Sequence, residues 1–401
     1  MNRAKLICLI TVAASSLAFG EGVSPAPTPA EVSIQKAQAQ IAQKPDHIPY
    51  YNALAMAYAR RARETSDVAF YQKGEETVAK ALELSPGNFE AEKVRVWLLL
   101  GRHEFQKALD AATPLNKKVP DDVTVYGYIA DANTELGNYP AAVDAIQWML
   151  RIKPGNIAGL TRAAYQREIH GDITGSMELM KMAYDATSYQ EFEDRAWLLT
   201  QMSHLSLVHG DVKNAELYAS GALGLFPAYH YALAALAQVR ELQNRHEDAV
   251  ALLDQRYKAA PHAENLFSLA EALKHAGRDA EADRAFAQFE KESLKESNIG
   301  DNSNHELMAY YVDDAKQPEK ALEIAQKELA RRQDITTLDC YAWALEAVGN
   351  YEQANAEMKK VLAVGTKDPK ILAHAKVIEE QAKLAGQAGP AQQARLDQPA
   401  N

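Results

Sequence analysis

Glycines that end apolar helical runs recur along most of this chain at a nearly constant spacing. The stretch ELGNYPAAVDAIQWMLRIKPGN, residues 135–156, contains the repeating unit: a helix-ending glycine, then alanines, larger apolar residues and a terminating proline. A period near 34 residues with only helical signals predicts paired antiparallel helices stacked side by side. The equivalent positions lie 33 to 39 residues apart, apart from one double gap of 72, and they are Gly101, Gly137, Gly171, Gly210, Asn244, Gly277 and Gly349.

The clearest unit covers residues 123–156. Its first helix is predicted to end at Gly137, because glycine adopts the left-handed conformation of a helix C-terminus without a Cβ penalty. Pro154 is predicted to end the second helix. Ala130 and Ala142 are small residues on the facing sides, so we expect the two helices to cross closely there.

This pattern resembles that of tetratricopeptide repeat proteins over roughly residues 45–365. The resemblance implies an all-α, right-handed superhelical solenoid of antiparallel helix pairs. It is weaker at Arg95, at Ser188 and over residues 305–334, which depart from the family pattern. The recurring small, apolar and proline positions that carry it are Ala108, Ala112, Leu115 and Pro120; Ala215, Ala219, Ala222 and Pro227; and Ala249, Leu253 and Pro261.

The ends of the chain differ from the repeats. Residues 1–20 have the basic start, apolar stretch and small residues of a signal peptide cleaved near Gly20, which predicts an exported protein, periplasmic or secreted. We expect no membrane span in the mature chain. The predicted order is a signal peptide at 1–20, a Pro/Ala-rich linker at 21–30, a helix at 31–44, about nine repeats within 45–368, a capping helix at 369–386 and a disordered tail at 387–401.

Two spacers interrupt the repeats. SYQEFEDRA adds about five residues before the fifth repeat, which is expected to begin at 195. KESNIGDNSNHE separates the seventh repeat from the eighth, where Ser303 and Glu306 have the spacing of a capping box.

Composition excludes some classes of partner. The net charge is −11 and the isoelectric point is about 5.6. Nucleic acids are bound by concentrated Lys and Arg, so this balance argues against them. Of the two cysteines, Cys8 lies in the predicted signal peptide, and Cys340 is then expected to be buried and inert.

The sequence offers few candidates for catalysis. His170-Gly171-Asp172 and His209-Gly210-Asp211 place a histidine near a carboxylate, but both fall in the helix-turn slot of the repeat, which explains them better. The histidines have no metal-binding spacing, and no phosphate-binding glycine loop or nucleophile motif occurs. We therefore predict no catalytic residues, no metal and no cofactor.

The candidate site is the concave face, which the first helix of each repeat lines in the family that the chain resembles. Tyr165, Trp197 and Tyr231 come from three consecutive repeats and would form an aromatic ladder, although packing between repeats is an equally good interpretation. Carrying the family's positions over gives Asp131, Thr161, Arg162, Tyr165, Glu168, Trp197, Thr200, His204, Tyr231, Gln238, Glu241, Glu271 and Trp343.

These observations favour a non-catalytic scaffold that binds a protein or peptide segment on its concave face in the periplasm or cell envelope. The alternatives are a structural, self-assembling envelope protein and, with less support, an enzyme with a helical cavity. The sequence does not identify the partner or the oligomeric state.

Overall fold

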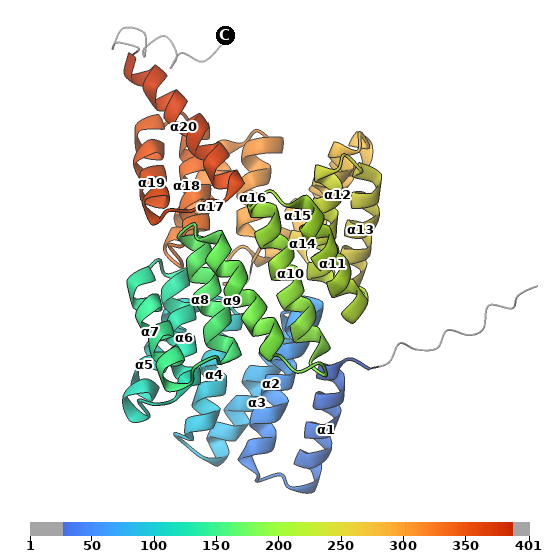
Figure 1. The fold of residues 1–401 in the computed structure, drawn as a ribbon, viewed down its shortest axis with the longest axis vertical. Coiled ribbons are helices and arrows are strands. Elements are labelled where there is room, and N and C mark those ends of the chain that lie inside the picture. Colours follow the sequence, from blue (N-terminus) through green and yellow to red (C-terminus); the bar gives the residue numbers. More distant parts are fainter. Residues whose placement is uncertain (1–26, 301, 388–401) are drawn as a thin grey trace, which may run out of the picture.

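The computed structural model describes residues 27–300 and 302–387, so the predicted signal peptide, most of the linker and nearly all of the predicted tail lie outside them. Within these residues the chain is helical and contains no strand, which confirms the expected all-α solenoid of antiparallel helix pairs (Figure 1). The elements are α1 (Pro29–Gln43); the pairs α2 (Ile48–Thr65) and α3 (Ala69–Leu84), α4 (Phe89–Gly101) and α5 (Phe105–Lys118), α6 (Val123–Glu135) and α7 (Tyr139–Ile152), α8 (Ile157–Ile169) and α9 (Ile173–Ala186), α10 (Phe192–Val208) and α11 (Val212–Leu225), α12 (His230–Leu242) and α13 (His246–Ala259), α14 (Ala263–His275) and α15 (Asp279–Glu296), α16 (Asn304–Ala309) with the π-helical η1 (Tyr310–Asp314) and α17 (Pro318–Leu329), and α18 (Ile335–Ala347) and α19 (Tyr351–Val364); and α20 (Pro369–Gln387).

The helix pairs follow from local signals in the sequence. Several first helices begin at an Asn or Asp whose side chain accepts a hydrogen bond from a backbone amide of the first turn, as Asp122 does from Thr124 and Val125. Within the third pair, Ala130 and Ala142 are 1% and 0% exposed, so the helices cross at these small residues as expected.

Both His-Gly-Asp triplets are helix turns. His170 and His209 are the C-caps of α8 and α10, and the glycine between each histidine and its aspartate has a positive φ. Asp172 Oδ1 accepts a hydrogen bond of 2.9 Å from the Gly175 amide at the start of α9. Asp211 caps α11 in the same way. The interpretation of these triplets as turns is confirmed.

Three expected boundaries or caps differ in the structure. Helix α1 begins at Pro29, before the expected residue 31, because Thr28 and Glu31 form a capping box ahead of it. Helix α10 begins at Phe192, so part of the first spacer extends this helix instead of forming a linker. The predicted Ser303–Glu306 capping box is wrong: the Ser303 side chain makes no cap hydrogen bond, because its buried hydroxyl is 2.7 Å from the hydroxyl of Ser293.

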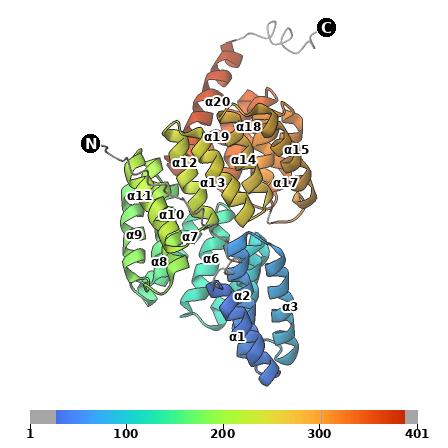
Figure 2. The same ribbon diagram turned by 90° about the vertical axis from the view of Figure 1, so that its right-hand side faces the viewer.

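The superhelix closes on itself. Turns in the N-terminal half contact loops in the C-terminal half. In both Figure 1 and Figure 2, helices α17 to α20 lie above α6 and α8. The Gln333 amide donates a 2.9 Å hydrogen bond to the Glu135 carbonyl, and the Ile335 amide donates one of 2.9 Å to the Tyr139 hydroxyl. Tyr139 also belongs to the hydrophobic cluster of the C-terminal helices. The concave face is therefore partly enclosed by the chain itself.

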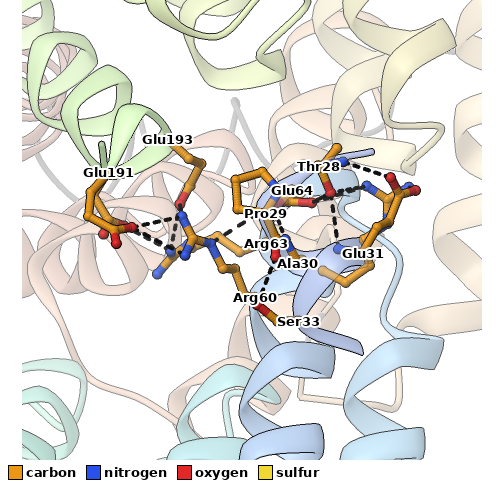
Figure 3. A network of polar contacts seen from close by, with 12 residues as sticks. Thr28, Pro29, Ala30, Glu31, Ser33, Arg60, Arg63, Glu64, Glu191 and Glu193 are labelled. Atoms are coloured by element: carbon orange, nitrogen blue, oxygen red, sulfur yellow. Dashed lines mark hydrogen bonds and ion pairs between the residues drawn. The ribbon is translucent and has the colours of Figure 1, made fainter. Parts of the chain in front are cut away.

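A polar network joins the first and fifth repeats (Figure 3). We call it the clasp and define it as Arg60 and Arg63 of α2 with Glu191, Glu193 and Asp194 at the start of α10. Arg63 Nη2 lies 2.8 Å from Glu193 Oε2 and 3.2 Å from Asp194 Oδ1. Arg60 Nη1 lies 3.4 Å from Glu191 Oε2. Three acidic residues in or beside the first spacer thus reach back to the first repeat.

Among the residues that the structure describes, none of the helices combines the length and apolar character needed to cross a membrane.

Candidate functional site: a chamber on the concave face

Closure of the superhelix leaves a partly open pocket of about 440 Å³, which we call the chamber. Helices from five different repeats and the loop before α18 contribute to its wall. Four residues predicted for the concave face, Asp131, Arg162, Tyr165 and Tyr231, line it together. The other residues that matter for its chemistry are Arg63, Tyr71, Trp97, Glu135, Gln166 and Arg332.

Tyr165 and Tyr231 face the chamber. Tyr165 is 43% accessible, yet burial raises the pKa of its hydroxyl well above the usual value. The accessible area of the Tyr165 ring faces the chamber, whose other lining residues surround it. Burial likewise raises the pKa of Tyr231, which also packs against the cluster around α10. Both rings are therefore available to a group inside the chamber.

Arg162 is held in place by several acceptors. Its Nε and Nη2 atoms lie 2.7 Å and 2.5 Å from the two carboxylate oxygens of Asp131, and Nε also donates to the Gly127 carbonyl at 3.2 Å. An added Cβ at Gly127 would lie 3.2 Å from Cζ of Arg162, so the glycine leaves room for the guanidinium. This bidentate pair gives the wall a fixed shape and leaves Arg162 already charge-compensated.

Gln166 was missed by sequence reasoning. It is 5% exposed, and its Nε2 donates a 2.7 Å hydrogen bond to the Thr134 hydroxyl. That hydroxyl donates in turn to the Ala130 carbonyl at 2.8 Å, so it can only accept from the amide of Gln166. The Oε1 atom of Gln166 has no hydrogen-bond partner among the described residues.

Glu135 was also missed, and it is the carboxyl group of the chamber wall with a strongly shifted pKa. Burial, with the nearby charges of Asp334 and Asp131, raises its pKa to about 8, while Arg332 opposes the shift. The carboxyl group is therefore largely protonated near neutral pH. It lies at the end of α6, next to the turn that contacts the loop before α18.

Repeat offsets could not have identified the chamber residues that come from distant repeats. Arg63 and Tyr71 belong to the first repeat, Trp97 to the second, and Arg332 to the loop after α17. They meet Tyr165 only because the superhelix closes, and no local sequence pattern signals that closure.

His204 and Glu168 form a separate pair on the first helices of the fifth and fourth repeats. His204 Nε2 lies 2.6 Å from Glu168 Oε1. Burial alone would lower the pKa of His204, but the hydrogen bond and charge of Glu168 raise it above its usual value. Nearby, Trp197 packs against the hydrophobic cluster around α10, and Thr200 is buried with its hydroxyl donating to the Ala196 carbonyl.

The remaining predicted residues lie apart from the chamber. Glu241 Oε2 lies 2.9 Å and 3.1 Å from the Nδ1 atoms of His246 and His275. The Trp343 ring stacks on His374 with centroids 4.3 Å apart, and its indole nitrogen donates to Asp313. Of the others, Thr161 donates to its own helix, and Gln238 and Glu271 are exposed. The residues predicted for the concave face therefore form several separate groups. Only the group of Asp131, Arg162, Tyr165 and Tyr231 lines the chamber.

A second cavity adjoins the chamber. It has a volume of about 570 Å³ and lies along α1 and α2, and we call it the entry cavity. Arg63, Tyr71 and Trp97 line both spaces, so these three side chains form the boundary between them. Met56, on the wall of the entry cavity, is 38% exposed.

Other chemistry finds little support in the described part of the chain. No group of three His, Cys, Asp or Glu side chains there is arranged to hold a metal ion. Cys340 is partly buried, and burial raises the pKa of its thiol well above the usual value, which makes the reactive thiolate scarce.

No family model matches the chain, and no curated protein matches it. Among solved structures it is similar to a chain of the APC/C hetero-tetramer Cut9–Hcn1, with 12% identity over 81% of this chain and a TM-score of 0.46. It spans 55% of the length of that chain. It is also similar to human IFIT1 in a dimer with m7Gppp-AAAA, with 12% identity over 82% of this chain and 85% of that chain and a TM-score of 0.49.

A further similar structure is PilW, described as a widely conserved type IV pilus biogenesis factor, with 16% identity over 52% of this chain and 93% of that chain and a TM-score of 0.41. Likenesses this distant say nothing about what this chain binds. The resemblance to tetratricopeptide repeat proteins is confirmed at the level of the fold, which the helix pairs of the structure display directly.

Proposed function

We propose that this protein is a non-catalytic scaffold that binds a segment of another protein along its concave face, in the periplasm or cell envelope. The observation that carries the proposal is the chamber, where Tyr165 and Tyr231 meet Trp97 and Tyr71 beside an entry cavity. Aromatic rings in a concave site give a large contact area at a low cost in conformational entropy.

Charge and targeting signals support the rest of the proposal. The net charge of −11 would steer a segment that carries some Lys or Arg toward the protein. The signal-peptide pattern of residues 1–20 supports export, and those residues lie outside the described part of the chain.

An enzymatic role has one feature in its favour, which is the raised pKa of Glu135. Acid–base catalysis would need a second reactive group within reach of the same space. The neighbouring carboxylate of Asp131 is bound by Arg162 through both oxygens. We therefore favour binding over catalysis.

Site-specific photo-crosslinking in cells that export the full chain tests the proposal. A benzophenone amino acid at position 165 would face the chamber, and one at position 189 would lie on the outer surface, where Tyr189 is 81% exposed. We expect position 165 to crosslink a distinct protein that position 189 does not, with helicity of both variants checked by circular dichroism. Crosslinks only from position 189, or none from position 165, would refute binding in the concave face.

A further inference from the structure

Helix α1 has no paired first helix in the described part of the chain. From α2 to α19 the helices come in pairs, and the second helix of each pair packs against the first helix of the next. Helix α1 packs against α2 in the same way, so it corresponds to a second helix whose first helix is missing. The sequence directly ahead of it, GVSPAPT, is a poor helix former because proline lacks the amide hydrogen.

The residues of α1 that would face the missing helix are found by counting back from the proline that follows each second helix. In the second repeat, the residues 12, 8 and 5 positions before Pro120 are buried in the cluster that joins α5 to α4 and α6; they are Ala108, Ala112 and Leu115. The same count from Pro45 gives three residues that all line the entry cavity; they are Ser33, Ala37 and Gln40.

Helix α2 contributes the other wall, through positions that a later repeat uses to contact the preceding first helix. Val94 and Leu98 of α4 belong to a buried cluster with residues of α2. Their equivalents in α2, 41 positions earlier, are Ala53 and Ala57, and both line the entry cavity. These walls are therefore the surfaces that a first helix covers in a complete repeat. We call them the seat and define it as Ser33, Ala37, Gln40, Ala53 and Ala57.

The side chains of the seat set the chemistry of its occupant. Three of the five are alanines, so a helix can approach closely and must itself supply the large apolar residues. Lys36 lies on the same wall and makes no ion pair with any residue that the structure describes, whereas Arg60 and Arg63 are bound in the clasp. A carboxylate on the incoming helix would therefore find a cation at Lys36. This attraction acts only at the seat, because salt screens it within about 10 Å.

We infer that the seat binds an amphipathic α-helix of the partner protein, which takes the place of the missing first helix and continues the concave wall beyond α2. Its apolar residues recur every three or four positions, and an acidic residue beside them pairs with Lys36. The inference rests on the proposed function and specifies the form of the bound segment. The seat adjoins the chamber, since Arg63, Tyr71 and Trp97 line both cavities.

The probe is a first helix of this chain. Helix α14 has a buried apolar face and carries the acidic residues Glu264 and Glu271. The peptide covers residues 262–276, with both ends blocked, and its control carries Ala270→Pro, which cannot continue a helix. Full chains with Ala53→Cys or Ala79→Cys are treated with N-ethylmaleimide, and modification at each position is followed by mass spectrometry. Both alanines are exposed, but Ala79 of α3 lines neither the chamber nor the entry cavity.

We expect the peptide to protect position 53 and not position 79. Modification at position 53 should slow about fivefold once about four fifths of the chain is bound, and the proline peptide should have no effect. Ala53→Trp fills the seat and should weaken peptide binding about tenfold, measured by fluorescence anisotropy, whereas Ala79→Trp should leave it unchanged. Lys36→Glu should weaken it about two- to fivefold.

The inference is overturned if the peptide at its solubility limit protects neither position, if it protects both equally, or if the proline peptide protects as well. Slow modification at position 53 before any peptide is added would also overturn it. The seat would then belong to a second copy if dilution restores the rate, and to residues of the same chain if it does not. Unchanged affinity in Lys36→Glu would overturn the acidic character of the occupant. Each of these results is independent of the crosslinking from position 165, so the inference can fail while the proposed function stands.

Discussion

Arg63 Nη2 lies 2.8 Å from Oε2 of Glu193, a residue 130 positions further along the chain. Glu193 is fully buried and also accepts a 2.9 Å hydrogen bond from the Tyr229 hydroxyl. Burial alone would raise the pKa of Glu193, but the charges of Arg63 and Arg60 and the hydrogen bonds hold it below its usual value. The clasp therefore keeps a buried charge where the first repeat meets the fifth.

Replacing Arg63 by methionine should destabilise the protein strongly, because it leaves Glu193 buried with only Arg60 and Tyr229 as partners. We expect a loss of about 3 kcal/mol in the free energy of unfolding, measured by urea denaturation. Adding Glu193→Met should restore much of that loss, since an apolar pair can replace a buried ion pair.

The matched control is Arg95→Met, which removes an ion pair to Glu92 from a side chain that is 48% exposed. It should change stability by less than about 1 kcal/mol. Equal effects of Arg63→Met and Arg95→Met would mean that the clasp is open in solution.

A second prediction compares two glycines that occupy the same slot of the repeat. Gly137 and Gly349 have φ of +74° and +80°, so alanine is strained at both. An added Cβ at Gly137 would lie 2.6 Å from the Gln333 carbonyl oxygen, whereas at Gly349 it would meet nothing within 4 Å. Gly137→Ala should therefore lower the free energy of unfolding by at least about 1 kcal/mol more than Gly349→Ala. Equal losses in urea titrations would contradict the closed superhelix.

The helix pairs could be predicted from the sequence because their signals are local. A residue such as Ala142 is small because it meets the preceding helix of its own pair, and Gly137 ends a helix through its own backbone. Contacts of this kind recur with the repeat, so the period shows them.

Closure could not be predicted in this way. It depends on backbone groups such as the Gln333 amide and the Glu135 carbonyl, which any residue provides. The two spacers broke the period visibly, but their role appears only in three dimensions, where Glu193 reaches α2 and an added Cβ at Gly300 would collide with the Arg102 carbonyl. The repeat offsets placed Tyr165 on a first helix, yet the residues opposite it, such as Trp97, depended on that closure.

A third prediction concerns the titration of His204. With Glu168 2.6 Å away, the pKa of His204 should lie above its usual value of 6.5, and Glu168→Gln should lower it. The pair stabilises the folded state below pH 6.5, and this contribution is lost as the pH rises through the folded pKa. NMR titration of the imidazole Cε1 proton measures both values. His230 serves as an internal reference, because burial lowers its pKa to about 4. An unchanged His204 pKa in Glu168→Gln would refute the pairing.

The last prediction follows from the protonated carboxyl group in the chamber wall. Glu135 has a pKa of about 8 when folded, because burial and the charges of Asp334 and Asp131 outweigh Arg332, against 4.5 for an unperturbed glutamate. Between these values the folded state binds the extra proton, so its stability falls as the pH rises. Glu135→Gln removes this loss, and the variant should gain about 3.5 kcal/mol over the unaltered protein from pH 5 to pH 8. Urea titrations across this range measure the gain, with the exposed Glu352→Gln as the control. Parallel pH profiles for the unaltered protein and Glu135→Gln would show that the carboxyl group is already ionised near neutral pH, with water or a cation as its partner.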